Sequence, residues 1–130
     1  MTLEEDEAAV RAANHAFYDA HEARDLVAMV ECWEHSDRVV CVHPGWPILR
    51  GWALVEEPWR RILHGPGRNQ FILTNDEVTV AGDVAWVTVD ENVMAGGAAG
   101  TVAATNVFVR ADGGLGWLLT IHHGSTVIPR

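Results

Sequence analysis

The hydrophobic pattern of this chain changes its period once, near Asn69, and this change limits the folds open to it. Before Asn69, apolar residues recur at helical spacing in three stretches: Met1–Arg24, a shorter one after Asp25, and Gly51–His64. After Asn69, the pattern is that of strands separated by turns. Helices followed by a run of antiparallel strands form an α+β arrangement. The sequence therefore predicts an α+β fold in which three helices cover one face of a strongly bent sheet.

Local signals set the expected limits of these elements. Thr2 with Glu5 resembles a capping box, and Asp25 is suited to cap the second helix. Pro58 lies inside the third helical pattern, so this helix is expected to be kinked or to start late. A flexible turn or broken strand end is expected at Gly96–Gly100. The expected strands are one that ends at His43, then Phe71–Val80, Val84–Val93, Thr101–Arg110 and Leu115–Val127.

Length and charge limit the possible partners. The 130 residues, 48% apolar and 21% charged, predict one globular domain spanning residues 1–130. A formal net charge of −9 argues against nucleic acid or an anionic membrane as a partner. No signal peptide is visible, and no apolar run approaches membrane-spanning length. Cys32 and Cys41 form neither a CxxC nor a zinc pattern, so we expect two reduced thiols and a cytoplasmic location.

The stretch VVCVHPGWP, residues 39–47, holds the first candidate for chemistry. Its apolar run predicts a buried strand that places His43 at the strand end, because Pro44 lacks a backbone donor and favours extended geometry before it. The pKa of a free imidazole lies near neutrality, so His43 is a candidate proton acceptor or donor in a pocket. A structural histidine, bonded within the core, is the alternative.

An amide that interrupts an apolar strand is the second candidate. Asn106 shares its strand face with three apolar residues: Val102, Ala104 and Phe108. Burying an amide there is costly unless it is hydrogen-bonded. Asn106 is therefore expected either to fix a carbonyl or carboxylate in an apolar cavity or to bond a neighbouring loop.

His122 and His123 are the third candidates, followed closely by Ser125. Adjacent strand residues point to opposite faces, so only one of the two histidines can enter a given cavity. They cannot then chelate one ion, and no HxH or HExxH spacing occurs, so no metal site is expected. No glycine-rich loop follows a strand and opens a helix, so no nucleotide cofactor is expected. Tyr18, at the edge of the apolar stripe of the first helix, has a hydroxyl that can reach a pocket or solvent.

Aromatic side chains are expected to build the pocket wall. Trp46 is the first candidate because its loop follows His43 directly. A Ser-His-Asp nucleophile set has no support, since the chain contains no GxSxG elbow. The other residues expected to line the pocket are Phe17, Trp33, Trp59 and Phe108.

Five segments, taken in chain order, carry a resemblance to a known family. They hold an Asp-Leu at the end of the first helix, a strand ending before a proline, Asp-Gly-Gly before a Trp-led last strand, and His-His-Gly-Ser. They look like the nuclear-transport-factor-2-like superfamily, which includes ketosteroid isomerase, SnoaL-like polyketide cyclases and the calcium/calmodulin-dependent kinase II association domain. The segments are Phe17–Leu26, Val39–Trp46, Gly51–Leu63, Thr105–Gly113 and Trp117–Ser125.

The resemblance implies a cone-shaped, curved antiparallel or mixed sheet wrapped around three helices, the cystatin-like barrel. It also implies a deep apolar pocket and, usually, a dimer. Ketosteroid isomerase uses an aspartate base and an oxyanion hole of tyrosine and protonated aspartic acid. In this sequence the base position resembles His43 and the protonated-acid position Asn106. The tyrosine position resembles Phe17, with Tyr18 one step round the helix, so all three chemical types differ.

Three functions remain open from the sequence. The first is a small-molecule-binding domain with an apolar pocket. The second is an isomerase, cyclase or dehydratase type of enzyme that takes a proton from a small carbonyl compound, with His43 as base. In it, Asn106, together with Tyr18 or one of the paired histidines, steadies the enolate. The third is an oligomerisation module.

Two structural expectations separate these functions. In an enzyme, His43 and Asn106 should converge on one cavity; in an assembly module, both should be bonded internally and the cavity filled. The expected ligand is small, either apolar or bearing a carbonyl or carboxylate group. Three helices are not expected to cover all the apolar strand residues, so we also expect a homodimer through the outer face of the sheet. Those strand residues are Trp86, Val107, Val109, Trp117 and Leu119.

Overall fold

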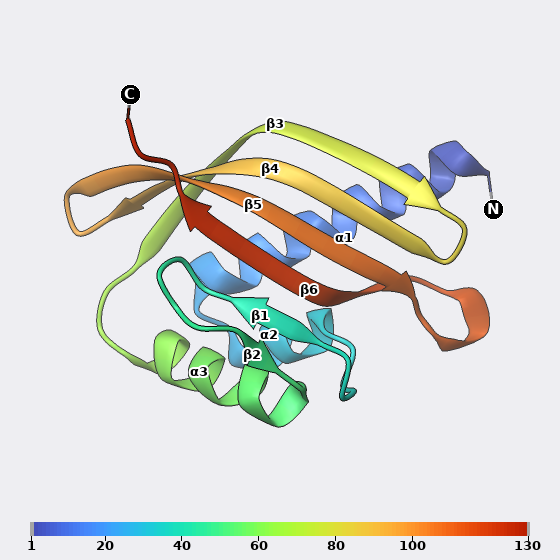
Figure 1. Ribbon diagram of the computed structural model, residues 1–130, viewed down its shortest axis with the longest axis horizontal. Coiled ribbons are helices and arrows are strands. Elements are labelled where there is room, and N and C mark those ends of the chain that lie inside the picture. Colours follow the sequence, from blue (N-terminus) through green and yellow to red (C-terminus); the bar gives the residue numbers. More distant parts are fainter. Residues whose placement is uncertain (1, 130) are drawn as a thin grey trace.

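A 21-residue helix, α1 (Leu3–Ala23), opens the chain and crosses one face of the sheet (Figure 1). The computed structural model describes residues 2–129. Thr2 is the N-cap, as the sequence predicts, since its hydroxyl accepts from the Glu5 backbone N–H at 3.1 Å. The Glu5 carboxylate accepts from the Thr2 hydroxyl, also at 3.1 Å, and not from the Thr2 backbone N–H as in a complete capping box. Arg24 ends α1 in the left-handed conformation. The Asp25 carboxylate then caps α2 (Leu26–Cys32), as predicted.

The third helix, α3 (Trp52–His64), contains Pro58 and runs on through it. The expected late start of this helix is therefore wrong. A proline at this position removes one hydrogen bond to the carbonyl four residues earlier, which belongs to Leu54. Leu54 itself is 61% exposed, and the loss of this one hydrogen bond does not end the helix, which continues to His64.

The six strands form one mixed sheet in the order β2-β1-β6-β5-β4-β3. Only β1 and β6 run parallel, and every other neighbouring pair is antiparallel. The sheet is curved and unclosed, so the predicted α+β class and the curved mixed sheet are confirmed. The strands are β1 (Val40–Val42), β2 (Leu49–Arg50), β3 (Asn69–Ala81), β4 (Val84–Ala95), β5 (Ala98–Arg110) and β6 (Trp117–Thr126).

The structure departs from the predicted elements in two places. The two-residue strand β2 was not predicted, because two residues are too few to show alternation. The expected loose turn at Gly96–Gly100 is a tight turn at Gly96 and Gly97, both with positive φ, and β5 already begins at Ala98. β5 therefore has three more residues paired with β4 than the predicted strand, which began at Thr101.

A bulge bends β3 over the helix. The register with β4 shifts between Thr74 and Glu77, and Asn75 inside this shift has a φ of 55°. Bulges bend the strand that carries them and increase its twist. The bend lets the long β3 and β4 strands curl around α1, which packs against β3, β4 and β6 (Figure 1).

The core lies between α1, the two shorter helices and the concave face of the sheet. Its largest fully buried side chains are aromatic and come from every part of the chain. The ring of Phe17 meets those of Trp33 and Trp59 edge-on, with centroids 6.4 and 5.6 Å apart. Trp33 and Phe108 are thus core residues. Because aromatic rings remove the largest apolar area from water, their burial contributes more to the stability of the fold than the burial of a smaller apolar side chain.

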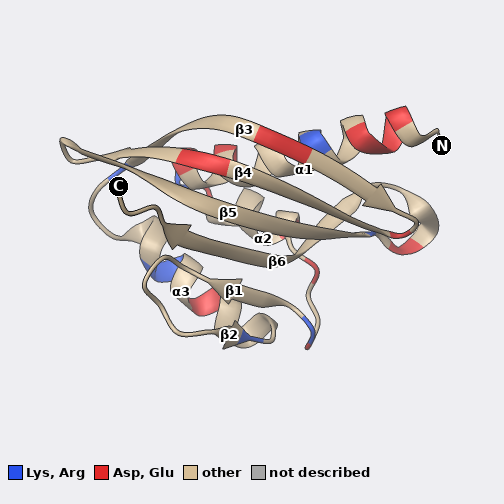
Figure 2. Cartoon of the chain, turned by 45° about the horizontal axis from the view of Figure 1, so that its top comes forward, with Lys and Arg blue, Asp and Glu red and all other residues tan. Residues whose placement is uncertain are grey.

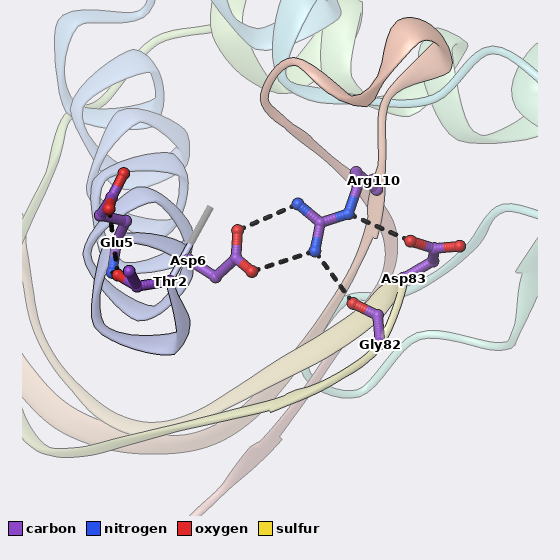
Figure 3. A network of polar contacts seen from close by, with 6 residues as sticks. All are labelled: Thr2, Glu5, Asp6, Gly82, Asp83 and Arg110. Atoms are coloured by element: carbon purple, nitrogen blue, oxygen red, sulfur yellow. Dashed lines mark hydrogen bonds and ion pairs between the residues drawn. The ribbon is translucent and has the colours of Figure 1, made fainter.

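Arg110 of β5 links the start of α1 to the turn between β3 and β4 (Figure 3). Its guanidinium donates two hydrogen bonds to the Asp6 carboxylate near the start of α1, at 2.9 and 3.1 Å. It also donates to Asp83 and to the Gly82 carbonyl in the turn between β3 and β4. The Arg110 guanidinium holds the pKa of Asp6 below its usual range. This bidentate pair fixes the N-terminal end of α1 against the sheet.

The outer face of the sheet carries no helix (Figures 1 and 2). Trp86 is 37% exposed there, beside the half-buried Val107. Trp117 and Leu119 lie instead on the covered face, because a register shift in β5 and β6 turns them inward. The apolar outer surface is thus smaller than the sequence suggested. The homodimer stays a prediction, which sedimentation of the purified chain will test.

Charge is unevenly distributed over the molecule. Acidic residues gather at the start of α1, where they suit the positive end of the helix dipole, and one of them, Asp6, pairs with Arg110 (Figures 2 and 3). Among the described residues, no helix is both long and apolar enough to cross a membrane.

Candidate active site

A cavity of about 260 Å³ opens between α1, α3 and the concave face of the sheet. This volume lies just below the range of roughly 300–1,000 Å³ typical for drug-sized ligands, so the cavity suits a smaller molecule. Its wall is largely aromatic, with polar side chains at separate points. The lining residues are Phe17, Tyr18, His21, His43, Pro44, Trp59, Asn69, Phe71, Glu91, Val93, Gly100, Thr101, Val102, His122 and Thr126.

His43 directly follows the last residue of β1, at the strand end where the sequence predicts it, and lines the cavity. Its ring centroid lies 4.8 Å from that of Trp59 and 4.9 Å from that of Trp46. The Cys41 thiol lies 3.6 Å from Nε2 of His43. Burial raises the pKa of Cys41 to about 12, so this thiol keeps its proton and can donate weakly to Nε2. Burial also lowers the pKa of His43 to about 4, so the ring is neutral at pH 7.

Asn106 is fully buried and lies one layer behind the cavity wall. Its amide nitrogen donates to Oδ1 of Asn14 at 2.8 Å and to the Tyr18 hydroxyl at 3.1 Å. Its carbonyl oxygen lies 2.6 Å from Nδ1 of His122. Every hydrogen-bonding end of Asn106 is therefore used within the protein. Asn106 acts on the cavity only through Tyr18 and His122.

The hydrogen bonds around Asn106 have a fixed direction. The Tyr18 hydroxyl accepts from Asn106, so its own proton is directed to Oε2 of Glu91, 2.5 Å away. The Asn106 carbonyl can only accept, so Nδ1 of His122 carries the hydrogen. The neutral His122 ring then has its lone pair on Nε2. We call Glu91, Tyr18, Asn106, Asn14 and His122 the polar chain.

Glu91 is the acidic member of the cavity wall. It is 5% exposed, and burial raises its pKa to about 7, while the hydrogen bond from Tyr18 opposes part of this rise. Burial and the neighbouring Glu91 raise the pKa of Tyr18 well above its usual range, so Tyr18 keeps its proton. A carboxyl group with a pKa near neutrality in a cavity is a candidate for proton transfer.

The paired histidines separate as strand alternation requires. His122 pairs with Asn106 on the concave face and lines the cavity, whereas His123 pairs with Thr105 and is exposed on the outer face. Burial, assisted by the charges of the neighbouring histidines, lowers the pKa of His122 to about 3. His21 of α1 adds a third imidazole to the wall, and burial followed by the effect of His43 lowers its pKa to about 4.

The expected wall aromatics divide between the cavity, the core and a loop. Phe17 and Trp59 line the cavity, as the sequence suggested. Trp33 and Phe108 are buried in the core behind the wall. Trp46 contacts the ring of His43 but is 38% exposed, and it lies outside the lining set. The loop after Pro44 turns Trp46 outward, since its N–H closes a turn onto the His43 carbonyl.

Sequence reasoning missed Glu91, Phe71 and the role of His21. The sequence does contain an indication of Glu91. Alternate residues of β4 point to the same face, and Glu91 continues the buried series Ala85, Val87 and Val89. A carboxylate in register with buried apolar residues needs a partner or a function.

The described residues hold no cluster of three or more His, Cys, Asp or Glu arranged to bind a metal ion. The three cavity histidines come from separate elements, and the ring centroids of His43 and His122 are 6.5 Å apart. The wall is therefore best described as neutral imidazoles around one carboxyl group.

Comparison with known proteins agrees with this architecture. The model of the SnoaL-like domain matches residues 10–129. A Streptomyces avermitilis crystal structure, named as a putative dehydratase of the NTF2-like family, is 38% identical with a TM-score of 0.90, covering 98% of this chain and 100% of that one. None of the curated proteins matches the chain.

Two further solved structures extend the comparison. A protein from Thiobacillus denitrificans, named as a putative calcium/calmodulin-dependent protein kinase type II association domain, is 33% identical over 91% of this chain and 94% of that one, with a TM-score of 0.81. An NTF2-like protein of unknown function from Pseudomonas putida has a TM-score of 0.85 at 19% identity, covering 99% and 92%, and shows the fold alone. The chain thus belongs to the SnoaL-like family of the nuclear-transport-factor-2-like superfamily.

Proposed function

We propose that this domain binds one small, largely apolar molecule in the cavity between α1, α3 and the sheet. The supporting observation is that the cavity remains open although Asn106, behind its wall, is bonded within the protein through both its amide nitrogen and its carbonyl oxygen. An assembly module without a ligand has no need for such a space, and apolar side chains tend to fill it. The satisfied Asn106 fixes the wall, and the aromatic rings supply the contact area for the ligand.

Binding of 2-phenylethanol, a neutral aromatic probe of suitable size, tests this proposal. We expect titration calorimetry to detect binding to the full chain, and Val93→Trp, which fills the cavity from β4, to weaken it about tenfold or more. Val84→Trp is the matched control, since Val84 lies in the same strand but is exposed outside the cavity. Unchanged binding in Val93→Trp would place the ligand elsewhere.

A second candidate function is proton transfer on a small carbonyl compound. Glu91, whose pKa burial raises to about 7, favours it, as does the 38% identity to the putative dehydratase. The base would take a proton from the carbon beside the carbonyl, and the C–H electron pair would move into an enolate. His43 is the base predicted from the sequence, but its low pKa and its contact with Cys41 make it a weak acceptor. Asn106 cannot steady the enolate directly, because both ends of its amide are engaged.

Deuterium exchange into 4-phenyl-2-butanone in D2O, followed by proton NMR, tests this second function. If Glu91 is the base, we expect Glu91→Gln to slow the exchange about 100-fold or more, and His43→Ala to keep most of it. If His43 is the base, we expect the reverse: His43→Ala slows the deuterium exchange about 100-fold or more, and Glu91→Gln keeps most of it. Exchange by the wild-type domain no faster than in buffer would rule out proton transfer on this class of ketone.

A further inference from the structure

The charge of the cavity wall restricts the ligand more than its shape does. Among residues 2–129, Glu91 is the one acidic residue of the lining, and none of the lining residues is a Lys or Arg. Arg24 and Arg68 line a neighbouring depression that shares His21 and Asn69 with the cavity. Arg24 is also engaged with the carbonyls of Leu63 and Gly67. A carboxylate ligand would therefore find no cationic side chain among the described lining residues.

One oxygen of Glu91 is available to a ligand. Tyr18 donates to Oε2, and among the described residues no hydrogen bond reaches Oε1. Oε1 is not among the buried polar atoms that lack both a partner and accessible surface. The carboxylate thus presents an unshared acceptor within a lining that it helps to form.

The aromatic rings that share the cavity lining with Glu91 suit a cation. Phe17, Tyr18, Trp59 and Phe71 all line the cavity, and the ring centroid of Phe71 lies 5.3 Å from that of Tyr18. The negative faces of aromatic rings attract ammonium groups, most strongly where water is excluded. The neutral ring of His122 adds a lone pair on Nε2, since its Nδ1 hydrogen is held by Asn106.

We propose that the cavity selects a small protonated amine with an aromatic or branched apolar body, whose ammonium group donates to the free oxygen of Glu91. This rests on the proposed small-molecule binding and names the ligand class for the same cavity. The fold already bears the cost of burying the Glu91 carboxyl group, so an incoming cation offsets an existing penalty. A carboxylate of the same size adds a second negative charge and is excluded.

The selectivity has a pH signature. The titratable groups facing Glu91 are Tyr18 and His21 from α1, His43 after β1 and His122 from β6, while β3, β5 and α3 contribute no ionisable side chain to the wall. The three histidines have pKa values lowered to about 4 or below, so above pH 6 they stay neutral. Between pH 6 and pH 8, Glu91 is therefore the group in the wall that changes charge.

The test compares three probes of matched size: 2-phenylethylamine, 2-phenylethanol and phenylacetate, titrated into the full chain by calorimetry. At pH 8 we expect the amine to bind about tenfold or more tightly than the alcohol, and phenylacetate to bind most weakly. From pH 8 to pH 6 the affinity for the amine should fall about tenfold as Glu91 takes up a proton, while that for the alcohol stays nearly constant.

Glu91→Gln should abolish the preference for the amine and its pH dependence, because glutamine still accepts from Tyr18 but carries no negative charge. Glu77→Gln on β3 is the control, as it removes the same charge from an exposed position. Amine binding no tighter than alcohol binding at pH 8, or an amine preference that survives Glu91→Gln, overturns the proposal and leaves small-molecule binding intact. Failure of all three probes to bind overturns both. The pH series on the wild-type chain decides the matter if Glu91→Gln does not fold.

Discussion

The domain should lose about 2–3 kcal/mol of its free energy of unfolding for each pH unit between pH 6 and pH 5. Burial lowers the pKa values of His21 and His43 to about 4 and that of His122 to about 3. In the unfolded chain these rings regain a pKa near 6.5. At pH 5.5 these three rings therefore bind about three more protons in the unfolded state than in the folded one. Their contribution to stability, complete above pH 6.5, is lost as the pH falls.

Glu91 acts in the opposite direction over the same range. Its pKa is about 7 in the folded state against 4.5 for the free side chain, so it contributes stability below pH 4.5 that is lost as the pH rises through 7. One proton from Glu91 against three from the histidines leaves a difference of about two protons. At about 1.4 kcal/mol per proton and pH unit, this difference gives the expected slope.

Urea unfolding at pH 5, 5.5, 6 and 7 measures this dependence. His43→Gln should reduce the slope by about 1.4 kcal/mol per pH unit, because one of the three titrating rings is gone. His15→Gln is the control, since His15 is exposed on α1. Free energies of unfolding that stay flat from pH 7 to pH 5 would show that the cavity histidines remain hydrated enough to protonate in the folded state.

Asn106→Ala should destabilise the domain by about 3–4 kcal/mol at pH 7. The substitution removes three hydrogen bonds at a fully buried position, to Asn14, Tyr18 and His122. Each buried polar group left without a partner costs about 1–3 kcal/mol. This loss approaches the upper end of what single substitutions do, and it comes from the breaking of one network.

Asn92→Ala provides a matched comparison. Asn92 on β4 also makes three hydrogen bonds, to the Ile72 carbonyl and the hydroxyls of Thr74 and Thr101. These bonds lie where water can replace the lost amide, so we expect a loss of about 1 kcal/mol or less. Urea unfolding of the two variants at pH 7 measures the difference. Equal losses would mean that water enters the site of Asn106 and satisfies its partners.

Asn106→Ala should also affect the ligand site. Without Asn106, Nδ1 of His122 has no acceptor and the Tyr18 hydroxyl loses its donor. The fixed tautomer of His122 and the direction of the Tyr18 proton both depend on that amide. A domain carrying Asn106→Ala should therefore bind probes in the cavity less selectively, even under conditions in which it remains folded.

The relation between His43 and Asn106 shows how far sequence patterns reach. A proline after a strand and an amide among apolar strand neighbours are local signals, and they identified His43 and Asn106 as candidates. The structure places His43 in the cavity wall and buries Asn106 behind it. Only His43 lines the cavity, however, because α1 brings Asn14 and Tyr18 against Asn106 and covers it. Sequence separations of 92 and 88 residues leave no local trace of these bonds.

By itself, the sequence determined the α+β class, the caps of the first two helices and the rule that only one of His122 and His123 enters a cavity. These features depend on hydrophobic period, side-chain hydrogen bonds within a few residues and strand alternation, all of which act locally. The tertiary structure alone decided that His122 is the inward one, that Trp46 turns away and that Glu91 faces the cavity beside Tyr18. Burial and partners fix these outcomes, and both come from strands and helices that meet only once the sheet has curved around α1.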